Sequence, residues 1–229
     1  MSYKTKILLV NLGSPKSPSV KDVKSYLREF LGNPKLVNIN PLIWKIILNF
    51  FILPFRPKSS AKLYQRIWDG SGFPLTKYSN EFCEKLNKQL GHKFDIQIVF
   101  SVPRVSLDKY FHNQTFEKNE KVFIIPLFPQ YSNSTTGLII DDIEKLLLKN
   151  NLKINPIIIK HFYHSLAFIN NSVELIEESL KRNPSEHLVL SFHGIPKISV
   201  TKFNDPYYEH CLQTYSLIKE RVKSIKNEN

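Results

Sequence analysis

Short apolar runs alternate with amphipathic stretches along most of this chain. The apolar runs fall at residues 6–11, 95–100, 121–127, 154–159 and 187–192. Apolar residues recur at helical spacing in the stretches between them, for example 19–31, 141–149 and 167–180. The runs have the length of buried strands, and the spacing is that of amphipathic helices. Strands that alternate with helices predict an α/β fold with mainly parallel sheets and helical crossovers.

The polar segment 112–120 is the best candidate for a domain boundary. We therefore expect one domain over residues 1–118 and a second over residues 119–229. A chain of 229 residues with 42% apolar content can bury a packed core.

The most apolar stretch, residues 41–54, begins and ends with proline and is interrupted only by Lys45 and Asn49. It does not predict a membrane span, which needs about 20 helical residues. Two interpretations remain open: a buried core helix, or an apolar lip that covers a large flat ligand and touches the membrane surface. Arg56 and Lys58 follow directly and would suit anionic headgroups or ligand carboxylates.

The chain is basic, with 32 Lys and Arg against 20 Asp and Glu and a net charge of +12. This charge favours an anionic partner, which could be nucleic acid, anionic lipid or an acidic small molecule. Nucleic acid is not expected, because no RNP-like, zinc-finger or arginine-rich segment is present. Dinucleotide, P-loop and Gly-x-Ser-x-Gly motifs are also absent. The chain opens without a leader sequence, so we expect a cytoplasmic protein.

A histidine lies where an apolar run meets a turn, in the segment Leu-Val-Leu-Ser-Phe-His-Gly-Ile-Pro at 188–196. In open α/β sheets, ligands bind at the point where such strands end, so His193 is a candidate functional residue. Further on, Asp205 can cap a helix whose first turn holds Pro206.

These residues resemble the ferrochelatase family, the enzymes that insert iron into a porphyrin. The resemblance rests on 188–196 with the following Asp-Pro-Tyr and Cys-Leu-Gln-Thr, and on two earlier segments: Val-Asn-Leu-Gly-Ser-Pro at 10–15 and Pro-Leu-Phe-Pro-Gln-Tyr-Ser-Asn-Ser-Thr-Thr-Gly at 126–137. A looser match covers 64–75. The resemblance as a whole implies two Rossmann-like, chelatase-like domains with parallel sheets flanked by helices, the second of which carries the histidine.

The implied reaction is insertion of ferrous iron into protoporphyrin IX, which forms protoheme in heme biosynthesis. Imidazole is neutral at physiological pH, so His193 would both accept pyrrole protons and contact the metal. The Ser- and Thr-rich loop before a helix would bind a propionate, although Ser134 or Thr135 could also simply cap that helix. The candidate porphyrin-binding residues are Ser14, Pro15, Arg56, Tyr131, Ser132, Ser134 and Thr135. The resemblance also favours the apolar lip and peripheral membrane contact through 41–58.

We expect no tightly bound cofactor, ferrous iron being a substrate. Some family members carry a cysteine-ligated iron–sulfur cluster in a C-terminal extension. This chain has neither that extension nor enough cysteines, since only Cys83 and Cys211 are present.

Several features depart from the family pattern. Val99 stands where many members have a pocket-facing arginine, Phe73 where serine is usual, and Asn204 where glycine is common. Family members also continue well beyond the Cys-x-x-Thr helix, through strands that carry a second functional carboxylate. We therefore expect an incomplete second domain. The alternatives are a truncated, inactive remnant that at most binds porphyrin, and a basic membrane-surface or nucleic-acid-binding module.

Overall fold

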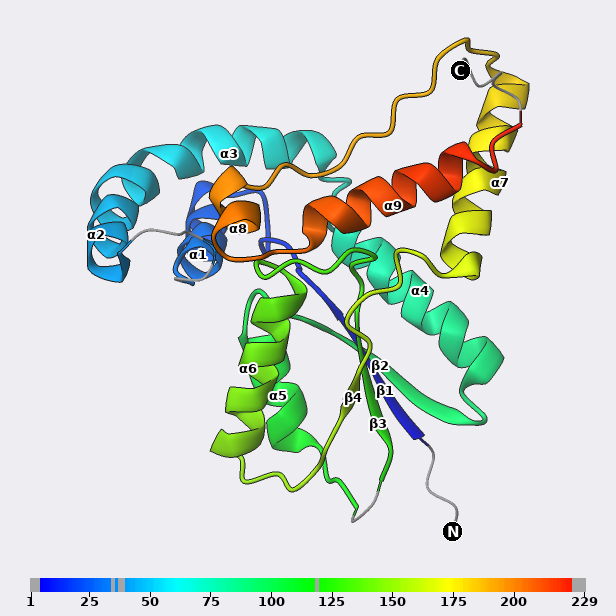
Figure 1. The fold of residues 1–229 in the computed structure, drawn as a ribbon. Helices are drawn as coiled ribbons and strands as arrows, with labels where there is room; N and C mark the ends of the chain where they lie inside the picture. Colours follow the sequence, from blue (N-terminus) through cyan, green and yellow to red (C-terminus); the bar gives the residue numbers. More distant parts are fainter. Residues whose placement is uncertain (1–4, 34–35, 37–39, 118–119, 224–229) are drawn as a thin grey trace. The chain divides into compact units, whose positions relative to one another are not determined.

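The computed structural model describes residues 5–33, 36, 40–117 and 120–223 (Figure 1). The described residues group into two compact units. Those up to 127, together with 134–159, form the first unit, and residues 128–133 with those from 160 onward form the second. The predicted domain boundary between 118 and 119 lies outside the described residues.

The first unit is built on a parallel four-stranded sheet, as the alternating pattern predicts. Its strands are β1 (Thr5–Asn11), β2 (Phe94–Phe100), β3 (Val122–Pro126) and β4 (Ile157–Ile158), in the order β2-β1-β3-β4. Central β1 pairs with β2 on one side and β3 on the other, and its Leu8, Leu9 and Val10 are all buried. A strand buried on both faces reads as a continuous apolar run, which is why the pattern identifies it.

The described part of the first unit also contains these helical segments: α1 (Val20–Leu31), α2 (Pro41–Ile46), the π-helical η2 (Ile47–Ile52), α3 (Leu53–Ile67), α4 (Pro74–Leu90), α5 (Val105–Asn113) and α6 (Thr136–Lys149). Helix α4 covers one face, where Cys83 packs with Leu9 and Ile96. Figure 1 shows α5 and α6 on the other side of the strands. Helix α1 packs instead on α3, through a cluster that includes Val23, Leu27 and Leu53.

The second unit is helical in its described part. It comprises α7 (Leu166–Arg182), α8 (Lys197–Thr201) and α9 (Tyr207–Lys219). Helix α7 packs on α9 through Ile169 and Ile218, together with Val222 just after α9.

Two strand predictions were wrong in extent or kind. The run at 154–159 forms only the two-residue β4, and the run at 187–192 forms no strand. A strand needs a hydrogen-bonded neighbour, and in the described residues none pairs with 187–192. Its apolar composition therefore does not produce a second sheet here.

The stretch 41–54 is not a buried core helix. Leu48 and Leu53 enter the core beside α1, whereas six large apolar side chains of α2, η2 and α3 are exposed: Leu42, Ile43, Ile46, Phe50, Phe51 and Phe55. The apolar lip stays a prediction. Within the described residues, no helix has the length and apolar content needed to cross a membrane.

Candidate functional site

A pocket of about 700 Å³ in the second unit carries His193 on its wall. It lies between the extended segment before α8 and the exposed face of α9. Most of its lining is apolar or aromatic, including Leu190, Phe192, Ile195, Val200, Tyr208 and Leu212. Pockets that bind flat organic ligands have this size and composition, with a few polar groups that orient the ligand.

The backbone of His193 is held by Tyr207, the first residue of α9. The His193 N–H donates a hydrogen bond of 3.1 Å to the Tyr207 hydroxyl, while the histidine residue as a whole stays exposed. Burial and a hydrogen bond with Cys211 raise the pKa of Tyr207 to about 12. The hydroxyl therefore stays protonated at physiological pH and serves as a neutral anchor.

Asp205 connects this segment to the polar loop that the sequence singled out. The residue is 3% exposed, and its Oδ2 atom accepts hydrogen bonds of 2.8 Å from the Ser132 hydroxyl and of 2.8 Å from the Asn133 N–H. Its Oδ1 atom accepts one of 3.0 Å from the Tyr207 N–H. The last bond holds the N–H of the first residue of α9. Pro206 occupies the N-cap position without a side-chain cap hydrogen bond, so the predicted places of Asp205 at the cap and of Pro206 in the first turn are each displaced by one residue.

The contact of Asp205 with Ser132 and Asn133 was missed by sequence reasoning, which identified Asp205 only as a helix cap. The two segments are more than 70 residues apart, so no periodicity or spacing signal connects them. The resulting path runs from Ser132 through Asp205 and Tyr207 to the backbone of His193.

Tyr131 belongs to the same loop and faces α9. Its N–H donates a hydrogen bond of 3.2 Å to Nδ1 of His210. Burial lowers the pKa of His210, and the nearby imidazoles of His161 and His164 lower it further. The neutral His210 can therefore accept this bond. Of the predicted site residues in the second unit, Ser132 is thus linked to the His193 backbone through Asp205 and Tyr207, whereas neither Tyr131 nor Ser132 lines the pocket that carries His193.

The other predicted residues belong to the first unit. Ser14 and Pro15 follow Gly13, which lies just after β1 and has a backbone φ of 95°. The Tyr26 hydroxyl donates to the Gly13 carbonyl at 3.4 Å, and it also hydrogen-bonds Tyr64 on α3. Burial raises the pKa of Tyr64, and the positive charge of Arg56 partly offsets this effect. This pair of tyrosines links the turn at Ser14 to the helix that carries Arg56.

Ser134 and Thr135 precede α6 in the first unit. Thr135 occupies the cap position without a side-chain cap hydrogen bond, so helix capping is not the role of its hydroxyl in this structure. The next residue, Thr136, is fully buried, and its Oγ1 is the buried side-chain polar atom without a hydrogen-bond partner among the described residues.

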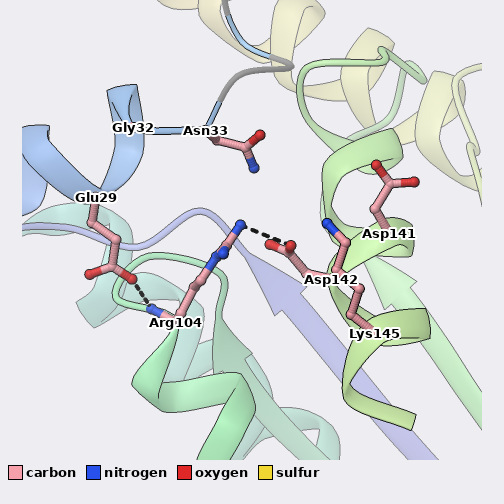
Figure 2. Close-up of a pocket in the computed structure, with 7 residues that line it drawn as sticks. All are labelled: Glu29, Gly32, Asn33, Arg104, Asp141, Asp142 and Lys145. Atoms are coloured by element: carbon pink, nitrogen blue, oxygen red, sulfur yellow. Dashed lines mark hydrogen bonds and ion pairs between the residues drawn. The ribbon is translucent and has the colours of Figure 1, made fainter. Parts of the chain in front are cut away.

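A second pocket, of about 320 Å³, lies in the first unit and is lined by charged residues (Figure 2). Figure 2 shows Arg104 between Glu29 of α1 and Asp142 of α6. The Arg104 guanidinium forms a 2.9 Å ion pair with Asp142, and its backbone N–H donates to Glu29. Burial raises the pKa of Asp142, and Arg104 opposes that rise. Because the charges of Arg104 and Asp142 are paired with each other, we interpret this pocket as a structural junction rather than a ligand site.

No three His, Cys, Asp or Glu side chains of the described residues lie close enough to hold a metal ion together. His193 accordingly has imidazole chemistry but no preassembled set of metal ligands in that part of the chain.

Comparisons with known proteins identify the family of the chain. A family model described as Ferrochelatase matches residues 4–229. The chain is 36% identical over 223 residues to the coproporphyrin III ferrochelatase of Enterococcus faecalis, a match that covers 97% of this chain and 71% of that protein. It is also 36% identical over 227 residues to ferrochelatases of Francisella tularensis subspecies, covering 96% of this chain and 67% of each relative. The chain is shorter than these relatives, and it belongs to the ferrochelatase family, the lyases of porphyrin and heme biosynthesis whose substrates are a porphyrin and a metal ion.

Proposed function

We propose that this chain inserts ferrous iron into protoporphyrin IX and that His193 is its catalytic residue. The observation that carries this proposal is the position of His193 on the wall of an apolar pocket large enough for part of a macrocycle. Insertion replaces two pyrrole N–H bonds with bonds to the metal and releases two protons. A neutral imidazole at the pocket wall is a suitable acceptor for such protons.

One imidazole accepts one proton at a time, so His193 has to pass the first proton on before it accepts the second. Its exposure allows exchange with solvent between the two transfers. The same neutral nitrogen can contact an incoming ferrous ion, because imidazole is a suitable ligand for iron. The apolar side chains around it would hold the flat ring by removing apolar surface from water.

The porphyrin carboxylates require cationic or hydrogen-bonding partners. We assign this role to Arg56 and to the residues of the two loops: Ser14, Pro15, Tyr131, Ser132, Ser134 and Thr135. Arg56 is exposed on α3, and Ser132 and Tyr131 lie in the unit that carries His193. The relative in Enterococcus faecalis is described as acting on coproporphyrin III, which has more carboxylates than protoporphyrin IX. Coproporphyrin III is therefore the second candidate substrate.

We further propose that the protein works without a tightly bound cofactor or an iron–sulfur cluster. Both cysteines are buried and free, and burial raises the pKa of each thiol. A raised pKa disfavours the thiolate form that binds iron.

Peripheral membrane contact through residues 41–58 is part of the proposal. The exposed side chains of Leu42, Phe50, Phe51 and Phe55 are flanked by Lys45, Arg56 and Lys58. Apolar residues beside cations favour binding at the surface of an anionic bilayer. The cytoplasmic location and the absence of nucleic-acid binding stay predictions.

The test is metal insertion by the purified chain, followed by porphyrin absorbance and fluorescence after anaerobic addition of ferrous iron, with a control that lacks the protein. Protoporphyrin IX and coproporphyrin III are compared at equal concentration. Turnover of protoporphyrin IX supports the proposal. Turnover of coproporphyrin III alone would transfer the activity to the second substrate. Binding without turnover would support the inactive remnant, and absence of binding would contradict both.

A further inference from the structure

We infer that Asp205 and Tyr207 are positioning residues, which hold the backbone of His193 and the Ser132 loop in one fixed arrangement. The inference rests on the proposed function, because the place of His193 matters only if its imidazole reacts. It concerns contacts within the second unit alone.

Asp205 is a buried carboxylate with donors on every side. Ser132 and Asn133 donate to one oxygen at 2.8 Å each, and Tyr207 donates to the other at 3.0 Å. The Asp205 N–H also donates to the Ser199 carbonyl at 3.0 Å, which adds the short helix α8 to the same junction. A buried charge is stable only when such donors surround it, and hydrogen bonds to a charged acceptor are stronger than neutral ones.

Tyr207 converts this junction into a constraint on His193. Its N–H is bound by Asp205, which fixes the start of α9, and its hydroxyl receives the His193 N–H at the far end of the ring. The aromatic ring is rigid between these two points. A shift of Asp205 would therefore move the point at which the His193 backbone is attached.

The two oxygens of Asp205 have separate tasks, and this makes the junction testable. Oδ2 faces the Ser132 loop, whereas Oδ1 faces the helix start. An asparagine has one acceptor oxygen and one NH₂ group, so it can satisfy only one side and meets an N–H or O–H donor with its own donor on the other. Asp205→Asn should therefore loosen the junction without changing its volume.

The decisive variant is Tyr207→Phe, which removes only the hydroxyl that accepts the His193 N–H. Its control is Tyr163→Phe, because the Tyr163 hydroxyl donates to Gln213 at 2.9 Å in the same unit and does not contact His193. We expect kcat for metal insertion to fall about tenfold in Tyr207→Phe, with KM for the porphyrin changed less than about twofold, since misplacement of a reacting group affects the chemical step. The control should keep the wild-type kcat.

A second measurement does not depend on activity. The backbone amide of His193, followed by ¹H–¹⁵N NMR, should shift and exchange faster with solvent in Tyr207→Phe and in Asp205→Asn, but not in Tyr163→Phe. An unchanged His193 amide in Tyr207→Phe would overturn the inference. An active wild type whose kcat survives Tyr207→Phe would also overturn it. An inactive wild type with the expected amide shifts would leave the anchoring in place and reject the proposed function instead. Should Tyr207→Phe fail to fold, Asp205→Asn supplies the same amide and kinetic comparison.

Discussion

The backbone N–H of His193 and the hydroxyl of Tyr207 are joined by a hydrogen bond of 3.1 Å. The bond leaves the imidazole free to face the pocket, because it uses only the backbone of the histidine. It also ties the candidate catalytic residue to the start of α9, where Asp205 accepts the Tyr207 N–H. The chemistry assigned to His193 thus depends on a neighbour that does not itself react.

Replacement of His193 by alanine should abolish metal insertion, because the proton acceptor is lost, and should leave porphyrin binding largely intact. Loss of general-base catalysis alone lowers the rate about 100-fold or more. Insertion rates and porphyrin fluorescence titrations measure the two effects separately. His187→Ala, in the same extended segment but outside the pocket lining, is the matched control. Insertion at the wild-type rate in His193→Ala would contradict the catalytic assignment.

Replacement of Arg56 by glutamine should weaken porphyrin binding about twofold to fivefold, the size expected for one exposed ion pair. Fluorescence titration with the free porphyrin and with its methyl ester separates charge from packing. The ester should bind the variant and the wild type equally. Arg66→Gln makes the same charge change on the same helix and should leave both affinities unchanged. If Arg56→Gln lost the same affinity for the free porphyrin and for its methyl ester, Arg56 would not contact a carboxylate.

Replacement of Phe50, Phe51 and Phe55 by serine should reduce binding to anionic phospholipid vesicles about tenfold or more, because three exposed apolar side chains are lost. Vesicle co-sedimentation at low and high salt measures the effect. Salt should weaken the binding of the wild type, since part of the attraction is electrostatic. Serine at the exposed Leu148 and Leu175 is the control for general loss of apolar surface. Undiminished binding of the triple variant would rule out the lip as the contact.

Acid should destabilise the second unit through His210. The pKa of this histidine in the folded protein is lowered below 6.5, first by burial, so the unfolded chain binds more protons in acid. The stability contribution is fully present above pH 6.5 and is lost as pH falls below it. The free energy of unfolding from urea titrations between pH 5 and 8 measures this loss.

His210→Asn is the variant that isolates this effect, because the asparagine oxygen can accept the Tyr131 N–H in place of Nδ1 and does not titrate. The decrease in the free energy of unfolding from pH 8 to pH 5 should be smaller in this variant than in the wild type. His92→Asn, at an exposed position of the first unit, should show the same decrease in stability at low pH as the wild type. An identical pH dependence in His210→Asn and wild type would exclude His210 as the source.

Replacement of Gly13 by alanine should destabilise the first unit by about 2 kcal/mol or more. Gly13 has φ 95°, and a Cβ there would lie 2.0 Å from the backbone oxygen of Val102. The left-handed backbone alone costs an L-residue about 1–2 kcal/mol. Thermal or urea unfolding measures the change. Gly72→Ala, at a position with no atom within 4 Å of the added Cβ, should be nearly neutral. Equal stability of the two variants would contradict the steric account.

Local sequence patterns were sufficient to predict much of the secondary structure of the first unit. The strands β1, β2 and β3 and helices such as α1 lie within one to two residues of their predicted ranges. Burial of both sheet faces and amphipathic spacing leave a signal in consecutive residues. The motif around His193 is also local, and so the candidate catalytic residue could be named before any contact was known.

The remaining features depend on residues that are distant in the chain. The apolar run at 187–192 has the composition of a strand, but a strand also needs a partner, and none is present in the described residues. The run at 41–54 has one composition throughout, yet packing on α1 buries Leu48 and leaves Phe50 exposed. The sequence by itself therefore determined the secondary-structure pattern, the family motifs and the choice of His193. Only the tertiary structure decided which apolar residues face solvent and that Ser132, Asp205 and Tyr207 form one hydrogen-bonded junction, because pairing and packing are set by contacts that local composition does not encode.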